Sequence, residues 1–168
     1  VPLTDQVTGL YAALSIMGAL FKRATTGVGE HVDMAMIDCA TAIVSPLSAG
    51  WFLSGQQAPR VGNDNPIAAP SGLFQTLDGK MIIASGNDGQ WAAICKALGI
   101  EHLIDDPRLN SLAARVRHRE LCHGAIDAVT RHRHRADVID ALNKAGVPCG
   151  PINEIGRASC RERVFSSV

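Results

Sequence analysis

The sequence predicts an α/β fold in which helices flank one short β-hairpin. Three observations lead to this fold class: apolar side chains recur at helical spacing over residues 4–26, an Asp-Gly pair at residues 78–79 separates two β-rich runs, and helical stretches with their own capping residues follow. Hydrophobic residues make up 46% and charged residues 19% of the 168-residue chain, as in globular domains. This composition excludes a disordered tail, a coiled-coil rod and a collagen-like repeat.

The first predicted element is a helix over residues 4–26. Thr4 or Asp5 can serve as its N-cap, and Gly27 and Gly29 end it. One face of this helix is apolar and consists of Leu10, Leu14, Met17 and Phe21.

The next elements are a short extended piece at residues 31–36 and a second helix over residues 37–54, with Pro46 as a kink. The second helix is almost wholly apolar, and a helix that is apolar on all sides is buried against another surface. A partner chain is one surface that could bury it. Residues 55–71 are rich in Gly, Asn and Pro and predict an irregular connector.

The second half of the chain predicts a hairpin and further helices. Asn87 or Asp88 caps the first helix after the hairpin, and Gly99 closes it. The expected elements are the hairpin over residues 73–85, helices over 88–98, 112–132 and 136–145, and an extended segment over 147–152.

We therefore divide the chain into three parts: a helical part over residues 1–58, a connector with a small α/β domain over residues 59–155, and a tail over residues 156–168. The tail ends in RASCRERVFSSV, which shows no helical or strand periodicity. We interpret it as foreign sequence, with a natural surface tail as the alternative.

The charge balance, the aromatic content and the cysteines limit the classes of function that the sequence can support. Lys+Arg and Asp+Glu are equal at 16 each, so the basic surplus of a nucleic-acid binder is absent, and aromatic residues are only 4%. No apolar run approaches the ~20 residues of a membrane span. The chain begins Val1-Pro2, which we read as a fragment or a trimmed chain. Five scattered cysteines without a CxxC pair predict free thiols in a reducing, cytoplasmic compartment; they are Cys39, Cys95, Cys122, Cys149 and Cys160.

Asp5 is the first candidate for chemistry. At a helix N-terminus its carboxylate faces unpaired backbone N–H groups and the positive end of the helix dipole. A carboxylate there can attack an activated acyl group and form a covalent intermediate. The alternative is an ordinary N-cap aspartate.

The loop that begins at Gly62 and Asn63 is the second candidate, because both residue types permit positive φ and expose backbone N–H groups to a ligand. It lacks the signatures of a phosphate-binding loop. The basic runs at residues 115–119 and 131–135 are either a phosphate-facing patch or solvated helix faces. The six histidines form no metal-binding pattern, so no metal site is predicted.

Four stretches together resemble the family III CoA-transferases, the group of formyl-CoA transferase, carnitine CoA-transferase and α-methylacyl-CoA racemase. They read DQVTGLYAALSIMGALFKRATTGVGEHVDMAMIDCA, RVGNDNPIAAPSGLFQTLDGKMIIASGND, DDPRLNSLAARVRHRELC and AGVPCGPINEI. Their order and spacing make the resemblance specific over residues 1–155.

The resemblance implies a fold, an assembly and a reaction. Members have a large Rossmann-like domain and a small domain, and two chains interlock as a homodimer. The present chain would hold the catalytic helix, the connector and the small α/β domain, with the Rossmann-like N-terminal half missing. Asp5 and Gly9 match the family's catalytic Asp and the Gly four residues later. Asp5 would attack an acyl-CoA, and CoA would pass through an aspartyl intermediate to a carboxylic acid, with no permanently bound cofactor.

The resemblance also leaves alternatives. In the racemases the equivalent Asp instead moves a proton at the α-carbon, opposite a His that matches none of the six here. Gly62 and Asn63 correspond to a flap over the active site that is richer in glycine in some transferases. A third alternative is an inactive fragment whose exposed apolar faces only seek a partner.

Overall fold

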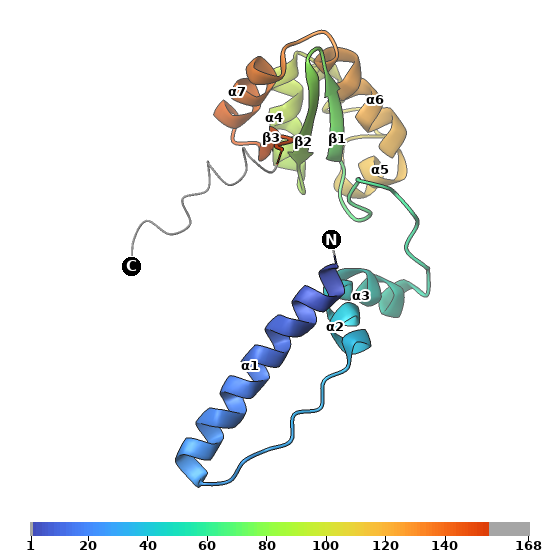
Figure 1. The fold of residues 1–168 in the computed structure, drawn as a ribbon. Coiled ribbons are helices and arrows are strands. Elements are labelled where there is room, and N and C mark those ends of the chain that lie inside the picture. The colour runs from blue at the N-terminus through green and yellow to red at the C-terminus, as the bar shows by residue number, and fades with distance from the viewer. Residues whose placement is uncertain (1, 155–168) are drawn as a thin grey trace. The chain divides into compact units, whose positions relative to one another are not determined.

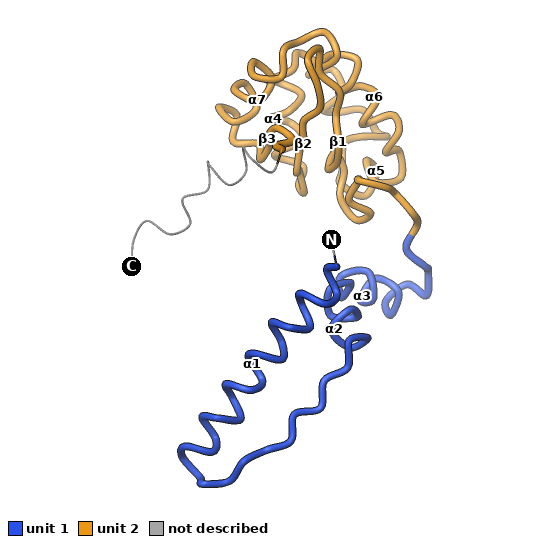
Figure 2. The backbone as a smooth tube through the Cα atoms, viewed as in Figure 1, with its two compact units in different colours: residues 1–58 blue, residues 59–168 orange. Residues whose placement is uncertain are grey.

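The computed structural model describes residues 2–154, which form two compact units, residues 2–58 and residues 59–154 (Figures 1 and 2). The tail predicted over residues 156–168 lies outside the described residues. Helices and an antiparallel sheet together confirm the predicted α/β fold class.

The first unit is a long helix followed by an extended return and two short helices. Helix α1 spans Leu3–Thr26 and ends where Gly27, at φ 72°, donates its N–H to the carbonyl of Arg23. Helices α2 (Met36–Ile43) and α3 (Ser45–Ser54) follow. Cys39 is the one buried side chain among residues 2–58, and α1 buries none at all.

The single kinked helix predicted over residues 37–54 is wrong, because α2 and α3 are separated at Val44 and bent by 74°. Pro46 lies in the first turn of α3, where its missing N–H leaves no helical carbonyl without a partner. The second helix therefore begins at Ser45, one residue before the proline. By length and composition this bent pair could together span a membrane, whereas no single helix among the described residues is long and apolar enough to do so.

The second unit is built on a three-stranded antiparallel sheet in the order β1-β2-β3. Strands β1 (Ser71–Thr76) and β2 (Gly79–Ala84) form the predicted hairpin, and β3 (Cys149–Pro151) pairs with the far edge of β2. Alternate residues of β1 and β2 are buried, and Phe74 lies opposite Met81 in the register. The hairpin therefore turns one apolar face toward the helices.

The helices of the second unit cover this apolar face. Figure 1 shows α6 beside β1 and α7 beside β2 and β3, and α4 packs against α7. Asn87 caps α4 by accepting the N–H of Gln90 at 2.8 Å, and Gly99 closes it at φ 77°, as predicted. The elements are α4 (Asp88–Leu98), a 3₁₀ turn (Glu101–Leu103), α5 (Leu112–Arg117), α6 (Arg119–Thr130) and α7 (Arg135–Lys144). Trp91 and Ile94 from α4 and Ile126 from α6 are buried in the shared core.

The long helix predicted over residues 112–132 is also two helices. The chain breaks at His118, with φ −108° and ψ 39°, between α5 and α6. No glycine or proline lies at this point in the sequence. No local helix breaker therefore accounts for the break, and Arg115 and Arg119, which flank it, both bind carbonyls of the connector.

Candidate active site

Asp5 lies in the first turn of α1, two residues after the helix begins. The N-cap position belongs to Pro2, so the expectation that Thr4 or Asp5 caps this helix is wrong; proline has no N–H to satisfy there. Within residues 2–154 no side chain caps the terminus, and the N–H groups of Leu3, Thr4 and Asp5 have no helical acceptor. The partial positive charge of these groups favours a carboxylate anion at this place.

Gly9 lies one helical turn after Asp5 on the same face of α1. Side chains of a helix lean toward its N-terminus, so a larger residue at position 9 would reach back toward Asp5. An ideal Cβ placed on Gly9 meets no atom within 4 Å, and Asp5 itself is exposed. The carboxylate is thus open to an approaching molecule from this side.

Gly62 and Asn63 belong to the second unit, whereas Asp5 belongs to the first, and the structure describes each within its own unit. Gly62 has φ 64°, the left-handed region that glycine adopts at little cost. Asn63 does not share this conformation, since every described residue with positive φ is a glycine.

The residues after Asn63 fasten the loop to the start of β1. The N–H of Asn65 donates to the carbonyl of Ser71 at 2.9 Å, and the Asn65 side chain accepts the N–H of Ile67 at 3.0 Å. The Asp64 carboxylate lies against Gly72, and its Oδ2 is 3.6 Å from Nδ1 of His123. This part of the loop is therefore held by both backbone and side-chain contacts.

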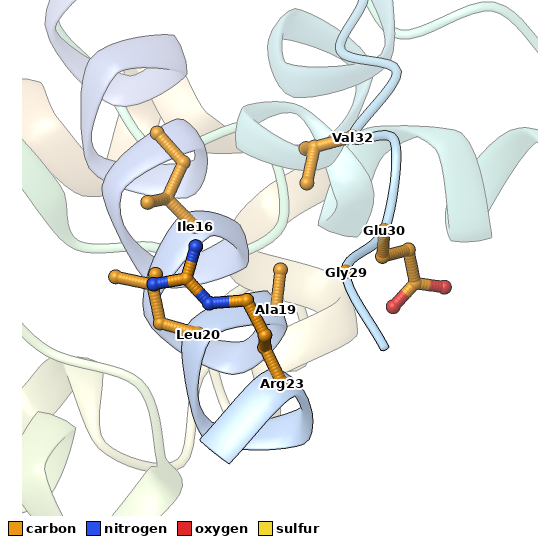
Figure 3. Close-up of a pocket in the computed structure, with 7 residues that line it drawn as sticks. All are labelled: Ile16, Ala19, Leu20, Arg23, Gly29, Glu30 and Val32. Carbon is orange, nitrogen blue, oxygen red and sulfur yellow. The ribbon is translucent and has the colours of Figure 1, made fainter. Parts of the chain in front are cut away.

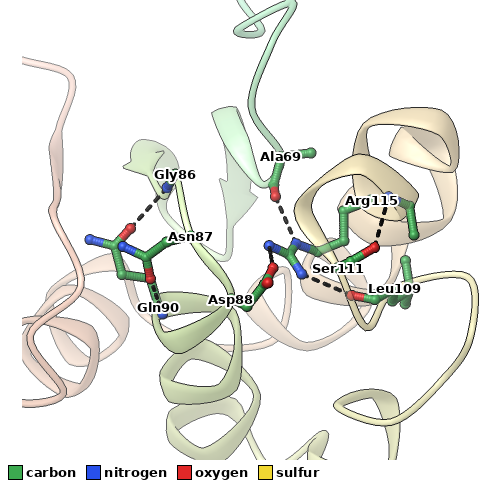
Figure 4. Close-up of polar contacts among 9 residues, drawn as sticks. Ala69, Gly86, Asn87, Asp88, Gln90, Leu109, Ser111 and Arg115 are labelled. Carbon is green, nitrogen blue, oxygen red and sulfur yellow. Dashed lines mark hydrogen bonds and ion pairs between the residues drawn. The ribbon is translucent and has the colours of Figure 1, made fainter.

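Arg115 is fully buried and holds the last residues of the connector, as Figure 4 shows. Its Nε donates to the carbonyl of Ala69 and its Nη1 to the carbonyl of Leu109, both at 2.9 Å. Its Nη2 donates to Asp88 Oδ1 at 2.8 Å, and the guanidinium carbon lies 5.6 Å from the centre of the Trp91 ring. These partners compensate for burying the charge.

Arg119 holds the same connector from the first turn of α6. It donates to the carbonyl of Ala68 at 3.0 Å and to that of Pro66 at 3.3 Å. Both interpretations of the basic run at residues 115–119 are wrong for Arg115 and Arg119, because their guanidinium groups bind backbone carbonyls inside the unit. They point neither to a phosphate nor freely to solvent.

The second basic run, at residues 131–135, packs on the turn of the hairpin. The N–H of Leu77 donates to the carbonyl of Arg133 at 3.0 Å, and the N–H of Arg135 donates to Asp78 Oδ1 at 2.7 Å. That bond from Arg135 lowers the pKa of the Asp78 carboxyl below its ordinary value. The run thus connects α6 and α7 to the hairpin.

Burial makes the core cysteines unreactive. It raises the pKa of the thiols of Cys95 and Cys122 to about 12 in each case, so both are neutral near pH 7. Neither is suited to act as a nucleophile. Within residues 2–154 no three His, Cys, Asp or Glu side chains are gathered closely enough to hold a metal ion.

The first unit contains a hollow between the C-terminal half of α1 and the extended segment after it, with a volume of about 310 Å³ (Figure 3). Arg23 and Glu30 are its charged residues, and its other lining residues are Ile16, Ala19, Leu20, Gly29 and Val32. It lies toward the opposite end of α1 from Asp5 and contains none of the candidate site residues.

Sequence reasoning missed the residues that hold the loop. Arg115, Arg119, His123 and Asp127 recur every four residues, and each contacts the segment between residues 64 and 75; for Asp127 the contact is the N–H of Gln75 at 2.9 Å. Arg119, His123 and Asp127 lie on α6, where residues four apart share one face, so a polar stripe at that spacing was the available signal for these three; Arg115 lies on α5, before the break at His118.

A family model, CoA-transferase family III, matches residues 1–166. The chain belongs to CoA-transferase family III. The resemblance carried by the four sequence stretches is thereby confirmed.

Relatives and a solved structure agree with this family III assignment. The chain is 36% identical to the succinate–glutarate CoA-transferase of Agrobacterium fabrum over 92% of its own length and 39% of that protein. It is 31% identical to the acetyl-CoA:oxalate CoA-transferase of Acetobacter aceti, over 94% of this chain and 40% of that one. A CAIB/BAIF family protein from Brucella suis matches with a TM-score of 0.74 and 37% identity, over 98% of this chain and 43% of that one.

The chain therefore spans about two fifths of the length of the family III proteins it matches. The residues that the family model matches, 1–166, include Asp5 with its helix, the connector and the small unit built on the three-stranded sheet.

Proposed function

We propose that this chain supplies the nucleophile and the small domain of an acyl-CoA:carboxylate CoA-transferase, with Asp5 as the nucleophile. Membership of family III together with the open, uncapped first turn that carries Asp5 supports this proposal. We also propose Gly62 and Asn63 as substrate-binding residues. Coenzyme A enters as a thioester substrate rather than as a bound cofactor.

The proposed reaction has two exchanges at Asp5. The carboxylate attacks the thioester carbonyl, the C–S bond breaks, and CoA leaves as a thiolate, so that an acyl-aspartyl anhydride remains. The thiolate then attacks the aspartyl carbonyl, the donor acid leaves as a carboxylate, and an aspartyl-CoA thioester forms. The acceptor carboxylate then attacks the aspartyl-CoA thioester, so that CoA leaves as a thiolate and a new anhydride forms. The thiolate attacks the acceptor's carbonyl carbon in this anhydride, which releases the new acyl-CoA and restores Asp5.

The backbone N–H groups at the start of α1 have a chemical role in these steps. Negative charge develops on the carbonyl oxygen of the aspartyl group when the thiolate attacks it. N–H groups without helical acceptors, here those of Leu3, Thr4 and Asp5, are donors of the kind that stabilise such an oxyanion.

We propose dicarboxylic acids as the substrate class. The names of the two relatives above refer to succinate, glutarate and oxalate, each of which carries two carboxylates. Because the chain is 36% and 31% identical to these two relatives, dicarboxylic acids are the acids to test first.

We also propose that the active protein is a homodimer. The apolar residues of α1 and α3 support this, since Phe21 is 74% exposed, Phe52 77% and Leu53 90% within their unit. Apolar surface of this extent is characteristic of an interface. Light scattering at two protein concentrations tests the assembly, and a monomer at both would contradict it.

The decisive experiment uses the longest natural protein that carries this sequence. It is incubated with succinyl-CoA and a panel of dicarboxylic and monocarboxylic acids in D₂O, and the products are identified by mass spectrometry. A new CoA ester, together with a CoA adduct on the peptide that contains Asp5, is expected. Asp5→Asn should abolish both. Deuterium at the α-carbon of a branched acyl-CoA without ester exchange would instead establish the racemase, and no reaction at all would leave only the family assignment.

Gly9 provides a matched control for Asp5. Gly9→Ala and Gly18→Ala both place a methyl group on α1, where a Cβ meets no atom within 4 Å at either position. Each should raise helix stability by about 1 kcal/mol. Only Gly9→Ala should lower the transfer rate, by roughly tenfold, because a displaced substrate loses its alignment with the nucleophile. Equal rates for the two variants would contradict the placement of the substrate beside Asp5.

A further inference from the structure

Helix α6 presents Arg119 and His123 one turn apart to the same stretch of connector. Arg119 donates to the carbonyls of Pro66 and Ala68, and His123 faces the carboxylate of Asp64. The two side chains thus meet the chain just after Gly62 and Asn63.

The imidazole of His123 is largely buried, with its side chain 16% exposed. Its ring centre lies 4.8 Å from that of Phe74 on β1, and its Nδ1 lies 3.6 Å from Asp64 Oδ2. Its Nε2 is buried and has no hydrogen-bond partner within residues 2–154. An unpaired lone pair is less costly there than an unpaired N–H, so a neutral ring with its proton on Nδ1 fits this environment; that N–H faces Asp64 Oδ2 at 3.6 Å, a polar contact longer than a hydrogen bond.

Asp64 is seated between β1 and α6. Its carboxylate lies so close to Gly72 that any side chain at position 72 would collide with it. Its own N–H donates to the carbonyl of Val61 at 3.2 Å, which closes the turn that contains Gly62 and Asn63. Fixing the Asp64 side chain therefore also fixes the turn.

We propose that His123 is a positioning residue that holds the carboxylate of Asp64 and thereby sets the backbone of Gly62 and Asn63 for the substrate. This rests on the proposed function, in which Gly62 and Asn63 bind the substrate. His123 acts through Asp64 and touches no reacting atom. Arg119 fixes the other end of the same loop.

Several charged groups set the protonation of His123. Burial lowers the pKa of the imidazole below its ordinary value. Asp64 on the loop and Asp127 on α6 raise the pKa, and Arg119 on α6 lowers it. The neutral form is therefore the working form near pH 7.

The first test measures the loop itself and needs no activity. Amide hydrogen exchange at residues 61–67 is compared in the 168-residue wild-type chain, His123→Asn and His123→Leu. The asparagine amide can occupy the place of Nδ1 and donate to Asp64, whereas leucine keeps volume without a donor. We expect His123→Leu and Asp64→Ala to accelerate exchange about tenfold at the loop, and His123→Asn to leave it near the wild-type rate. Equal exchange in all variants would overturn the proposal.

The second test measures the reaction, in the longest natural protein that carries this sequence. His123→Leu should raise KM about tenfold with little change in kcat, and His123→Asn should restore KM. A lower kcat at constant KM, or poor folding of both variants by circular dichroism, indicates a merely structural residue and would overturn the proposal. If the wild-type protein transfers no CoA, the proposed function is wrong. If the His123 variants still change amide hydrogen exchange at residues 61–67 as expected, the contact between His123 and the loop is nevertheless supported.

Discussion

Arg115 and Asp88 form an ion pair in which the two partners differ sharply in exposure. The Nη2–Oδ1 distance is 2.8 Å, the Arg115 side chain is completely buried, and that of Asp88 is 60% exposed. If the ion pair is lost, water can hydrate the exposed carboxylate of Asp88. No water reaches the buried guanidinium of Arg115 or the carbonyls that it binds. Arg115 therefore stabilises the fold mainly through its hydrogen bonds to the carbonyls of Ala69 and Leu109, and less through its ion pair with Asp88.

Removing Arg115 should therefore destabilise the fold much more than removing the charge of Asp88. Arg115→Met leaves the carbonyls of Ala69 and Leu109 buried without donors and should lower the free energy of unfolding by about 2–5 kcal/mol. Asp88→Asn should lower it by about 1 kcal/mol or less. Urea unfolding followed by the fluorescence of Trp91, in a Trp51→Phe background, measures both. Equal losses in the two variants would show that the ion pair dominates.

Acid should weaken the fold through His123. Because burial lowers the pKa of this imidazole below 6.5, the unfolded chain takes up a proton that the folded chain resists. The stabilising contribution is complete above pH 6.5 and is lost as the pH falls from there toward the pKa of the folded state. Urea midpoints at about pH 7.5 and 5.5 should differ less in His123→Asn than in the wild type. The same difference in both proteins would contradict this prediction.

Gly72 should tolerate no side chain while Asp64 is present. Gly72→Ala places a methyl group against the Asp64 carboxylate and should lower the free energy of unfolding by about 1–3 kcal/mol. Gly150→Ala, in the edge strand β3, meets no atom within 4 Å and is the control. Adding Asp64→Ala to Gly72→Ala should recover part of the loss in a double-mutant cycle. Strict additivity would contradict the contact.

The buried cysteines should not react with thiol reagents in the folded chain. Burial raises the pKa of Cys95 and Cys122 to about 12, so neither forms a thiolate at pH 8. Labelling with a maleimide, followed by peptide mass spectrometry, should modify both only after unfolding in urea. Rapid labelling of either in the native chain would show that this part of the core opens readily.

The sequence predicted those elements whose signals are local. Asn87 and Gly99 mark both ends of α4, and the Asp-Gly pair at residues 78–79 places the hairpin within a residue or two. Each of these signals depends on backbone conformation at one or two positions, and neighbours elsewhere in the chain do not change it.

The breaks at Val44 and His118 and the burial of Arg115 could not be predicted in this way. Arg115 stands in a run of basic residues whose composition indicates a solvated surface. Only the folded unit brings the Ala69 carbonyl of the connector and Trp91 of α4 beside it, 46 and 24 residues earlier in the chain. The candidate nucleophile Asp5 stays a prediction drawn from the resemblance, supported by its open position on α1.

Arg115 and Arg119 hold the connector by its carbonyl oxygens, which every amino acid carries. These hydrogen bonds do not depend on which side chains residues 66, 68 and 69 carry. Residues 68 and 69 are buried, so only their size is restricted. Ile67, between residues 66 and 68, is exposed, and its own hydrogen bond, to Asn65, also comes from its backbone N–H, so its side chain is free to change. The side chains of this segment can therefore change while its hydrogen bonds to Arg115 and Arg119 persist, so the sequence next to the loop can vary without loss of the contacts that hold it.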